Sequence, residues 1–96
     1  MQQKDKFGET LLHIACHTQN IDIEMIRLIL QNGADPNLKN NTGRTSMHYI
    51  CQNESANFDI MKLLIEYGAD PNFKDYYGFT PFDRLRKNKQ NAIVKK

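Results

Sequence analysis

Apolar residues in this chain gather in two clusters per unit, separated by mostly polar segments that hold glycine, proline and asparagine. Their spacing predicts a helix over residues 11–17 and a second over 23–32, because side chains three and four positions apart share a helix face. Residues 23–32 are apolar around most of the circumference, so we expect burial on several sides. The mostly polar residues 17–21 form the predicted bend between the two helices.

The same pattern returns 35 residues later with matched chemistry. The sequence Gly-Ala-Asp-Pro-Asn occupies residues 33–37 and again residues 68–72. A second signature begins at Gly8, Gly43 and Gly78, which are spaced by the same period. Two motifs that share one period indicate stacked repeats, in which each unit covers the apolar face of its neighbour.

This period predicts one domain, residues 1–96, built from successive units. We place the first repeat at about 5–39, the second at about 40–74, and a partial or capping third repeat at about 75–96. The third unit becomes charged soon after it starts, and its second helix is predicted only over 91–96.

Residues at the predicted element ends have the chemistry that those ends require. Thr10 and Asp22 stand where helix N-caps are expected, and Gly8 stands in a turn that needs a positive φ. Thr80 is the predicted cap of the third unit, with Pro81 at the first helical position.

The repeated motifs resemble those of the ankyrin repeat. Gly-Glu-Thr-Leu-Leu-His at residues 8–13 is similar to that family's first-helix signature, and the likeness covers residues 5 to about 88. The resemblance implies an all-α fold, an α-solenoid of stacked helix-turn-helix units joined by extended β-hairpin-like loops. The unit exceeds the usual length of about 33 residues, and the extra residues fall in the bend between the helices. Such stretched bends resemble those of some viral and bacterial ankyrin proteins.

Composition favours an ordinary globular protein, with 40% hydrophobic and 25% charged residues. No apolar run is long enough to span a bilayer, and no apolar segment follows the first residues as in a secretory signal. Cys16 and Cys51 occupy equivalent positions one repeat apart, about 8–10 Å if the units stack, which exceeds disulfide reach. We therefore expect free thiols and an intracellular protein, cytoplasmic or nuclear.

One group of residues has the chemistry of zinc ligands, namely His13, Cys16, His17, His48 and Cys51. Within each pair, His13–Cys16 and His48–Cys51, the two side chains share a helix face. The two pairs lie one repeat apart, however, which is too far for them to form one tetrahedral site. The resemblance implies instead that His13 and His48 brace a threonine and the backbone, while the cysteines act as small buried hydrophobes. No nucleophile, base and oxyanion-binding group converge in the pattern, so we expect no metal, no cofactor and no enzymatic activity.

The net charge of +2 is unevenly placed, with +5 on residues 81–96 and −3 on residues 1–80. A basic segment can hold nucleic acid or another polyanion through its phosphates, and the aromatic residues before it could stack on bases. Those aromatics precede most of the charge, however, so a solvated capping face explains the segment better. Polyanion binding is the alternative function.

Positions that differ most between repeats lie at the expected hairpin tips and on the outer side of the first helices. Solenoids present such positions along a concave surface, and in ankyrin repeats this surface typically binds a protein. We therefore expect a non-catalytic protein-interaction module, as a fragment of a larger ankyrin-repeat protein such as a viral or bacterial host-interaction factor. The predicted contact residues are Lys6, Phe7, Glu9, Asn41, Thr42, Arg44, Tyr76, Tyr77 and Phe79.

The last three of these residues, Tyr76, Tyr77 and Phe79, form the predicted hot spot, because exposed aromatic side chains anchor interfaces. For Phe79, packing against a following repeat or the chain end is an equally good expectation.

Overall fold

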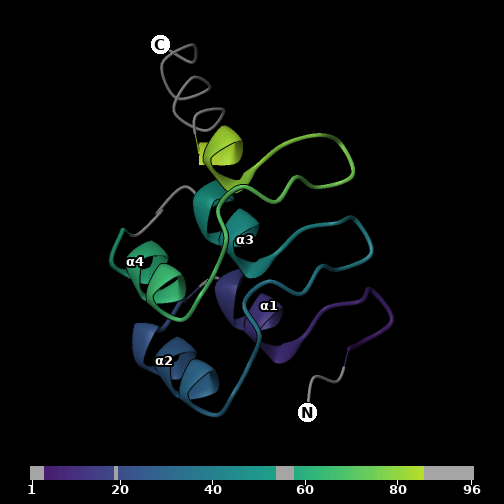
Figure 1. Ribbon diagram of the computed structural model, residues 1–96. Helices are drawn as coiled ribbons and strands as arrows, with labels where there is room; N and C mark the ends of the chain where they lie inside the picture. Colours follow the sequence, from purple (N-terminus) through teal and green to yellow (C-terminus); the bar gives the residue numbers. More distant parts are fainter. Residues whose placement is uncertain (1–3, 19, 54–57, 86–96) are drawn as a thin grey trace.

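The computed structural model describes residues 4–18, 20–53 and 58–85 (Figure 1). It contains the helices α1 (Leu11–Cys16), α2 (Ile23–Gln31), α3 (Ser46–Gln52) and α4 (Phe58–Glu66), and helical backbone continues the pattern at 81–85. The described residues form no strand, and the predicted all-α class is confirmed. The helix predicted over 91–96 and the basic segment after residue 85 lie outside the described residues.

Both helices of the first unit end one residue before the predicted position. His17 and Asn32 follow α1 and α2 as C-caps, and the backbone N–H of each donates into the last helical turn. The predicted N-caps are confirmed, since Thr10 Oγ1 accepts from His13 N at 3.3 Å and Asp22 Oδ1 accepts from Glu24 N at 3.0 Å.

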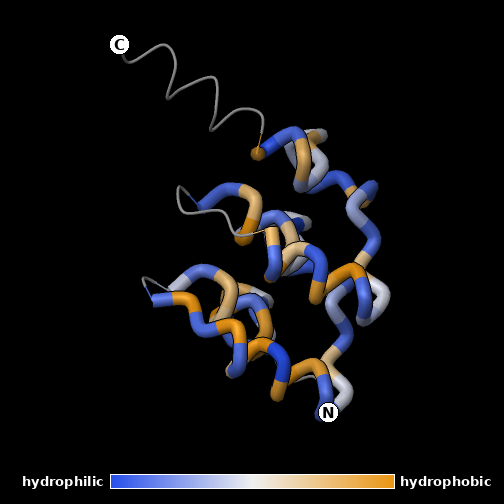
Figure 2. The backbone as a smooth tube through the Cα atoms, turned by 90° about the vertical axis from the view of Figure 1, so that its left-hand side faces the viewer, coloured by the Kyte–Doolittle hydropathy of each residue, from blue (hydrophilic) through white to orange (hydrophobic). Residues whose placement is uncertain are grey.

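The units stack in the order of the chain. Helix α1 packs against α2 and α3, and α3 packs against α4. Figure 1 shows the long loops before α3 and before residues 81–85 projecting to the same side as the N-terminal loop. Figure 2 shows hydrophobic and hydrophilic stretches alternating within each layer, as stacked amphipathic helices require.

One core runs through the stack and draws on all four helices. It is built from aliphatic, methionine and cysteine side chains, namely Leu12, Cys16, Ile26, Ile29, Leu30, Met47, Ile50, Cys51, Ile60, Met61, Leu63, Leu64 and Ala69. Burial of this apolar surface is the main favourable contribution to folding. None of the described helices has the length and apolar character needed to cross a membrane.

The prediction that α2 is buried on several sides is wrong for one face. Met25 is 51% exposed and Leu28 is 55% exposed, whereas the equivalent Ile60 and Leu63 in α4 are each 3% exposed. Helix α4 stacks on the first unit, which covers Ile60 and Leu63 (Figure 1). The corresponding face of α2 is not covered in this way by any described residue, so Met25 and Leu28 remain exposed. Burial at these positions is therefore supplied by the preceding unit.

Candidate functional site

Three loop tips form a continuous surface, which we call the hairpin surface (residues 5–9, 40–44 and 75–79). Two backbone hydrogen bonds close each tip. The outer one runs from Asp5 N to Glu9 O (2.9 Å), from Asn40 N to Arg44 O (2.9 Å) and from Asp75 N to Phe79 O (2.8 Å), and the inner one runs from the N–H of the tip's glycine to the carbonyl oxygen of its first residue. Another joins each tip to the next, from Asn41 N to Phe7 O and from Tyr76 N to Thr42 O, both at 3.0 Å. The tips are thus held at a fixed spacing by the main chain.

The first residue of each tip organises the turn with its side chain. Asn40 Oδ1 accepts from the backbone N–H groups of Thr42 (2.9 Å) and Arg44 (3.0 Å). Asp5 and Asp75 make the same pair of bonds in their own tips. Short side chains that accept from the backbone two residues ahead are typical of Asx turns, which explains an aspartate or asparagine at each of these positions.

Neighbouring tips approach so closely that glycine is required at the contact. Gly8 has the predicted positive φ of +75°, and a Cβ built there would lie 2.9 Å from the backbone nitrogen of Asn41. Gly43 has φ +79°, and its Cβ would lie 2.5 Å from Cδ1 of Tyr76. A side chain at either position would therefore push two tips apart as well as strain the turn.

Two buried histidines brace the tips against the helices, as the resemblance implied. Nδ1 of His13 accepts from Thr10 N at 3.1 Å, and its Nε2 donates to the carbonyl oxygen of Arg44 at 2.9 Å. His48 repeats this arrangement one unit later. Burial lowers the pKa of both imidazoles below the ordinary value, so each is neutral at physiological pH.

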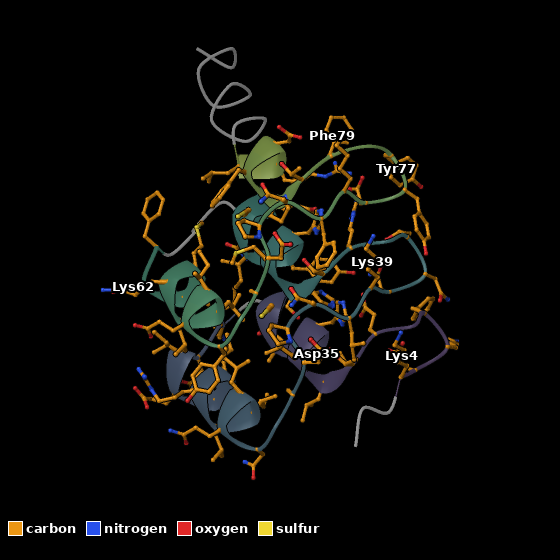
Figure 3. All side chains as sticks on the ribbon, viewed as in Figure 1. Lys4, Asp35, Lys39, Lys62, Tyr77 and Phe79 are labelled. Carbon is orange, nitrogen blue, oxygen red and sulfur yellow. The ribbon has the colours of Figure 1, made fainter. Side chains whose placement is uncertain are left out.

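The predicted contact residues fall into two groups. Lys6, Phe7, Asn41, Tyr76 and Tyr77 are exposed, and the aromatic members of this group present large surfaces, with 60% of Phe7, 70% of Tyr76 and 66% of Tyr77 open to solvent. Figure 3 shows Tyr77 at the tip of the third loop. Glu9, Thr42, Arg44 and Phe79 are instead half-buried and make contacts within the chain.

Glu9 belongs to a hydrogen-bonded cluster beneath the first two tips. Its carboxylate accepts from the Tyr49 hydroxyl, from His17 Nε2 at 3.1 Å and from Asn40 Nδ2 at 3.4 Å. Burial alone would raise the pKa of Glu9, but these hydrogen bonds outweigh it and lower the pKa below its usual value. Burial, together with the bond to Glu9, raises the pKa of Tyr49 to about 12. The ionised Glu9 carboxylate therefore links the first tip to Asn40 of the second tip and to Tyr49 of α3.

Asp75 forms the matching support beneath the third tip. Its buried carboxylate accepts from Nη2 and Nε of Arg84 at 2.6 and 3.2 Å, with Nε of Arg44 3.7 Å away. Burial opposes ionisation, but the Arg84 hydrogen bonds hold the pKa of Asp75 below its usual value. Arg84 was expected to belong to a solvated basic segment, and that expectation is wrong because its guanidinium neutralises Asp75.

The Arg84 guanidinium also covers Phe79, at 4.5 Å from the ring centroid. Phe79 therefore packs toward the chain's last described segment, the second of the two environments expected for it.

The described residues bring together no group of three or more histidine, cysteine, aspartate or glutamate side chains that could hold a metal ion. Cys16 and Cys51 are free and buried, and desolvation raises the pKa of each thiol to about 12. Such thiols are protonated at neutral pH and are poor nucleophiles.

The repeat pattern gives no sign that Tyr49 belongs to the site, and it groups Asn40 and Asp75 with the variable tip positions, although both are buried. A signal was present, because Asn40–Tyr49 and Asp75–Arg84 are both separated by nine residues. These pairs occupy equivalent positions in consecutive units but have different chemistry, so the repeat pattern does not reveal that they are partners.

Comparison with known families shows what the chain is similar to. A family model described as ankyrin repeats in three copies matches residues 1–95. A search of curated proteins gave no match.

Proposed function

Because this chain belongs to the ankyrin-repeat family, we propose that it binds another protein through its hairpin surface. Ankyrin repeats are generally protein–protein interaction modules and typically have no catalytic activity. The observation that carries the proposal is the exposure of Phe7, Tyr76 and Tyr77 on tips that are joined by backbone hydrogen bonds. Large aromatic side chains dominate the energetics of many interfaces, and a preorganised surface loses little conformational entropy on binding.

The two groups of contact residues have different roles in this proposal. Lys6, Asn41 and the exposed aromatic residues contact the partner. Glu9, Arg44 and Phe79 hold the tips in place through Tyr49, Asp75 and Arg84. Thr42 Oγ1 donates to Asn40 Oδ1 at 2.8 Å and belongs to the second group.

The proposal extends to the organisation and origin of the protein. We assign repeats to about 5–39, 40–74 and 75–96 within one domain, and we infer a fragment of a larger ankyrin-repeat protein that acts in the cytoplasm or nucleus. The buried free thiols support a reducing compartment. The lengthened bends between helices support a viral or bacterial host-interaction factor, by their resemblance to such proteins.

The test is capture of a partner by the chain, followed by measurement of its affinity for variants. Tyr77→Ala, alone and combined with Tyr76→Ala, should weaken binding about 30-fold or more, the size of a hot-spot loss of about 2 kcal/mol. Because Tyr76 lies over Gly43, the single Tyr77 variant separates a binding effect from a change in tip packing. Circular dichroism and melting temperature should stay unchanged.

Tyr67→Ala is the matched control, since Tyr67 is also an exposed tyrosine but follows α4 rather than lying in a tip. Undiminished affinity of the double variant, or an equal loss in the Tyr67 variant, would place the binding surface elsewhere.

A further inference from the structure

We propose that the hairpin surface recognises an acidic segment in polyproline II conformation, with a carboxylate at every third residue. The carboxylates would bind a column formed by Lys4, Lys39 and Lys74, which we call the lysine column. This inference rests on the proposed function, because it takes the partner to be a polypeptide, and it adds the chemistry and spacing of the recognised segment.

The lysine column follows the repeat, and its side chains reach from one unit to the next. Nζ of Lys4 donates to the carbonyl oxygen of Lys39 at 3.0 Å, and Nζ of Lys39 donates to the carbonyl oxygen of Lys74 at 3.3 Å. Both pairs are 35 residues apart. Figure 3 shows Lys4 and Lys39 on successive loops, on the side of the molecule that carries Tyr77. Two ammonium groups are therefore held in place at the spacing of the units.

The column carries positive charge that the described part of the chain leaves without an acidic partner. The ion pairs among the described residues involve Arg27, Arg44, Arg84 and His17, and no lysine. An ammonium group has three donors, so a lysine bonded to one carbonyl keeps two for a ligand. The column is thus positive and keeps donor capacity for a ligand, and Lys39 Nζ also lies 5.2 Å from the centroid of the Phe73 ring.

Acidic side chains within the tips offset this charge only in part. Residues 4–9, 39–44 and 74–79 contain five cationic and three acidic side chains, and of the three acidic ones Asp75 is buried beneath Arg84, Glu9 is half-buried and Asp5 is exposed. Lys6 adds an exposed cation near the start of the column, and its Nζ lies 5.3 Å from the centroid of the Phe7 ring. A ligand with negative charge is therefore complementary to this edge of the surface.

The spacing of the column selects the ligand's conformation. Stacked helical units lie about 8–10 Å apart, and equivalent side chains share that spacing. A polyproline II helix has three residues per turn and a rise of about 3.1 Å, so every third side chain lies on one face about 9 Å from the last. In a β-strand, side chains three residues apart point to opposite faces. A ligand with one carboxylate per turn of polyproline II therefore matches the spacing of the lysines.

The neighbouring aromatic residues favour the same conformation. Proline-rich segments in polyproline II conformation dock on surfaces lined by aromatic side chains. Tyr76 and Tyr77 are exposed and follow Lys74 by two and three residues, and the exposed Phe7 follows Lys4 by three. The residues between the carboxylates can therefore be prolines that contact these rings, while the carboxylates bind lysine.

The experiment uses the full chain and synthetic, fluorescently labelled peptides. The probe peptide repeats Glu-Pro-Pro, and a composition-matched peptide has its glutamates contiguous. A helical peptide with glutamate every seventh residue, which places its carboxylates about 10.5 Å apart on one face, tests the helical alternative. At about 50 mM salt, where charge screening is weak, we expect the Glu-Pro-Pro peptide to bind about tenfold more tightly than either comparison peptide.

Lysine variants test the column itself. Lys39→Gln and Lys74→Gln should each weaken binding several-fold, and their combination should abolish the preference for the three-residue period. Lys62→Gln is the control, since Lys62 is an exposed lysine of α4 on the opposite side of the molecule (Figure 3). Lys74→Gln removes no hydrogen bond found among the described residues, so it should melt at the wild-type temperature and report on binding alone.

Four results would overturn the proposal. Equal affinity for all acidic peptides would show a non-specific polyanion surface. Tighter binding of the helical peptide, or of a single-stranded oligonucleotide, would identify a different ligand. An equal loss with Lys62→Gln would show that the column is not the site. If lysine variants retain a captured partner that Tyr77→Ala loses, the proposed function stands and this inference fails.

Discussion

The imidazole of His13 links its own unit to the next through the carbonyl oxygen of Arg44, which accepts from Nε2 at 2.9 Å. Because Nε2 donates to a carbonyl, Nδ1 has no proton and accepts from Thr10 N. His48 makes the same link to Phe79 at 2.8 Å. A protonated ring would place an N–H on Nδ1 opposite the N–H of the threonine, so this brace requires the neutral imidazole.

The first prediction concerns stability and pH. Burial lowers the pKa of His13 and His48 below 6.5, so the unfolded chain takes up protons near pH 6.5 that the folded chain does not. The free energy of unfolding should therefore be level above about pH 7.5 and should fall as the pH drops below 6.5, by at most about 1.4 kcal/mol per pH unit for each histidine. Urea denaturation at about pH 7.5, 6.5 and 5.5 measures it.

A double variant, His13→Gln and His48→Gln, is the control for this window and should be less stable but less sensitive to pH. Glu9 and Asp75 have lowered pKa values, so their contribution is lost only at more acidic pH, below 4.5 and 3.8 respectively. A wild-type free energy of unfolding that stays constant from pH 7.5 to 5.5 would contradict the assignment of neutral imidazoles to His13 and His48 in the folded chain.

The second prediction concerns Asn37, whose side chain joins two units. Its Nδ2 donates to the carbonyl oxygen of Gly68 at 2.9 Å, and its Oδ1 accepts from Asp70 N at 2.7 Å. Asn37→Ala should lower the free energy of unfolding by about 1–3 kcal/mol, since two hydrogen bonds are lost. Asn72→Ala alters the equivalent asparagine, whose side chain makes no such bond to described residues, and should cost less than about 0.5 kcal/mol. Equal losses would refute the bridge.

The third prediction compares two equivalent leucines. Leu63 is buried and Leu28 is mostly exposed. Leu63→Ala should destabilise the fold by about 2–5 kcal/mol, because it leaves a cavity. Leu28→Ala should change stability by less than about 1 kcal/mol, because little apolar surface is lost and alanine is a strong helix former. Thermal or urea denaturation of the two variants measures the difference, and similar losses would mean that a neighbour covers Leu28 in solution.

The fourth prediction concerns the thiols. Cys16 and Cys51 are inaccessible, with pKa values raised to about 12 by burial, so neither should react with iodoacetamide in the folded chain near pH 8. Both should react after denaturation in urea, and intact mass before and after denaturation counts the modified sites. Fast labelling of native protein would show that the core opens readily, as expected only of a marginally stable stack.

Sequence by itself determined the local part of this structure. The 35-residue period located the helices, and residue chemistry within three or four positions identified the Thr10 and Asp22 caps and the positive φ of Gly8. These features depend on backbone geometry and on nearby hydrogen bonds, which a short stretch of chain specifies without knowledge of its neighbours.

Only the tertiary structure decided which side chains meet between units and which remain open. Glu9 takes Tyr49 as its partner, and Arg84 takes Asp75 instead of joining a solvated basic face. Leu28 and Leu63 share a residue type and a repeat position, yet one is exposed and the other buried. Burial and charge pairing depend on what the adjoining unit places within a few ångströms, and periodicity reports equivalent positions rather than neighbours across the stack.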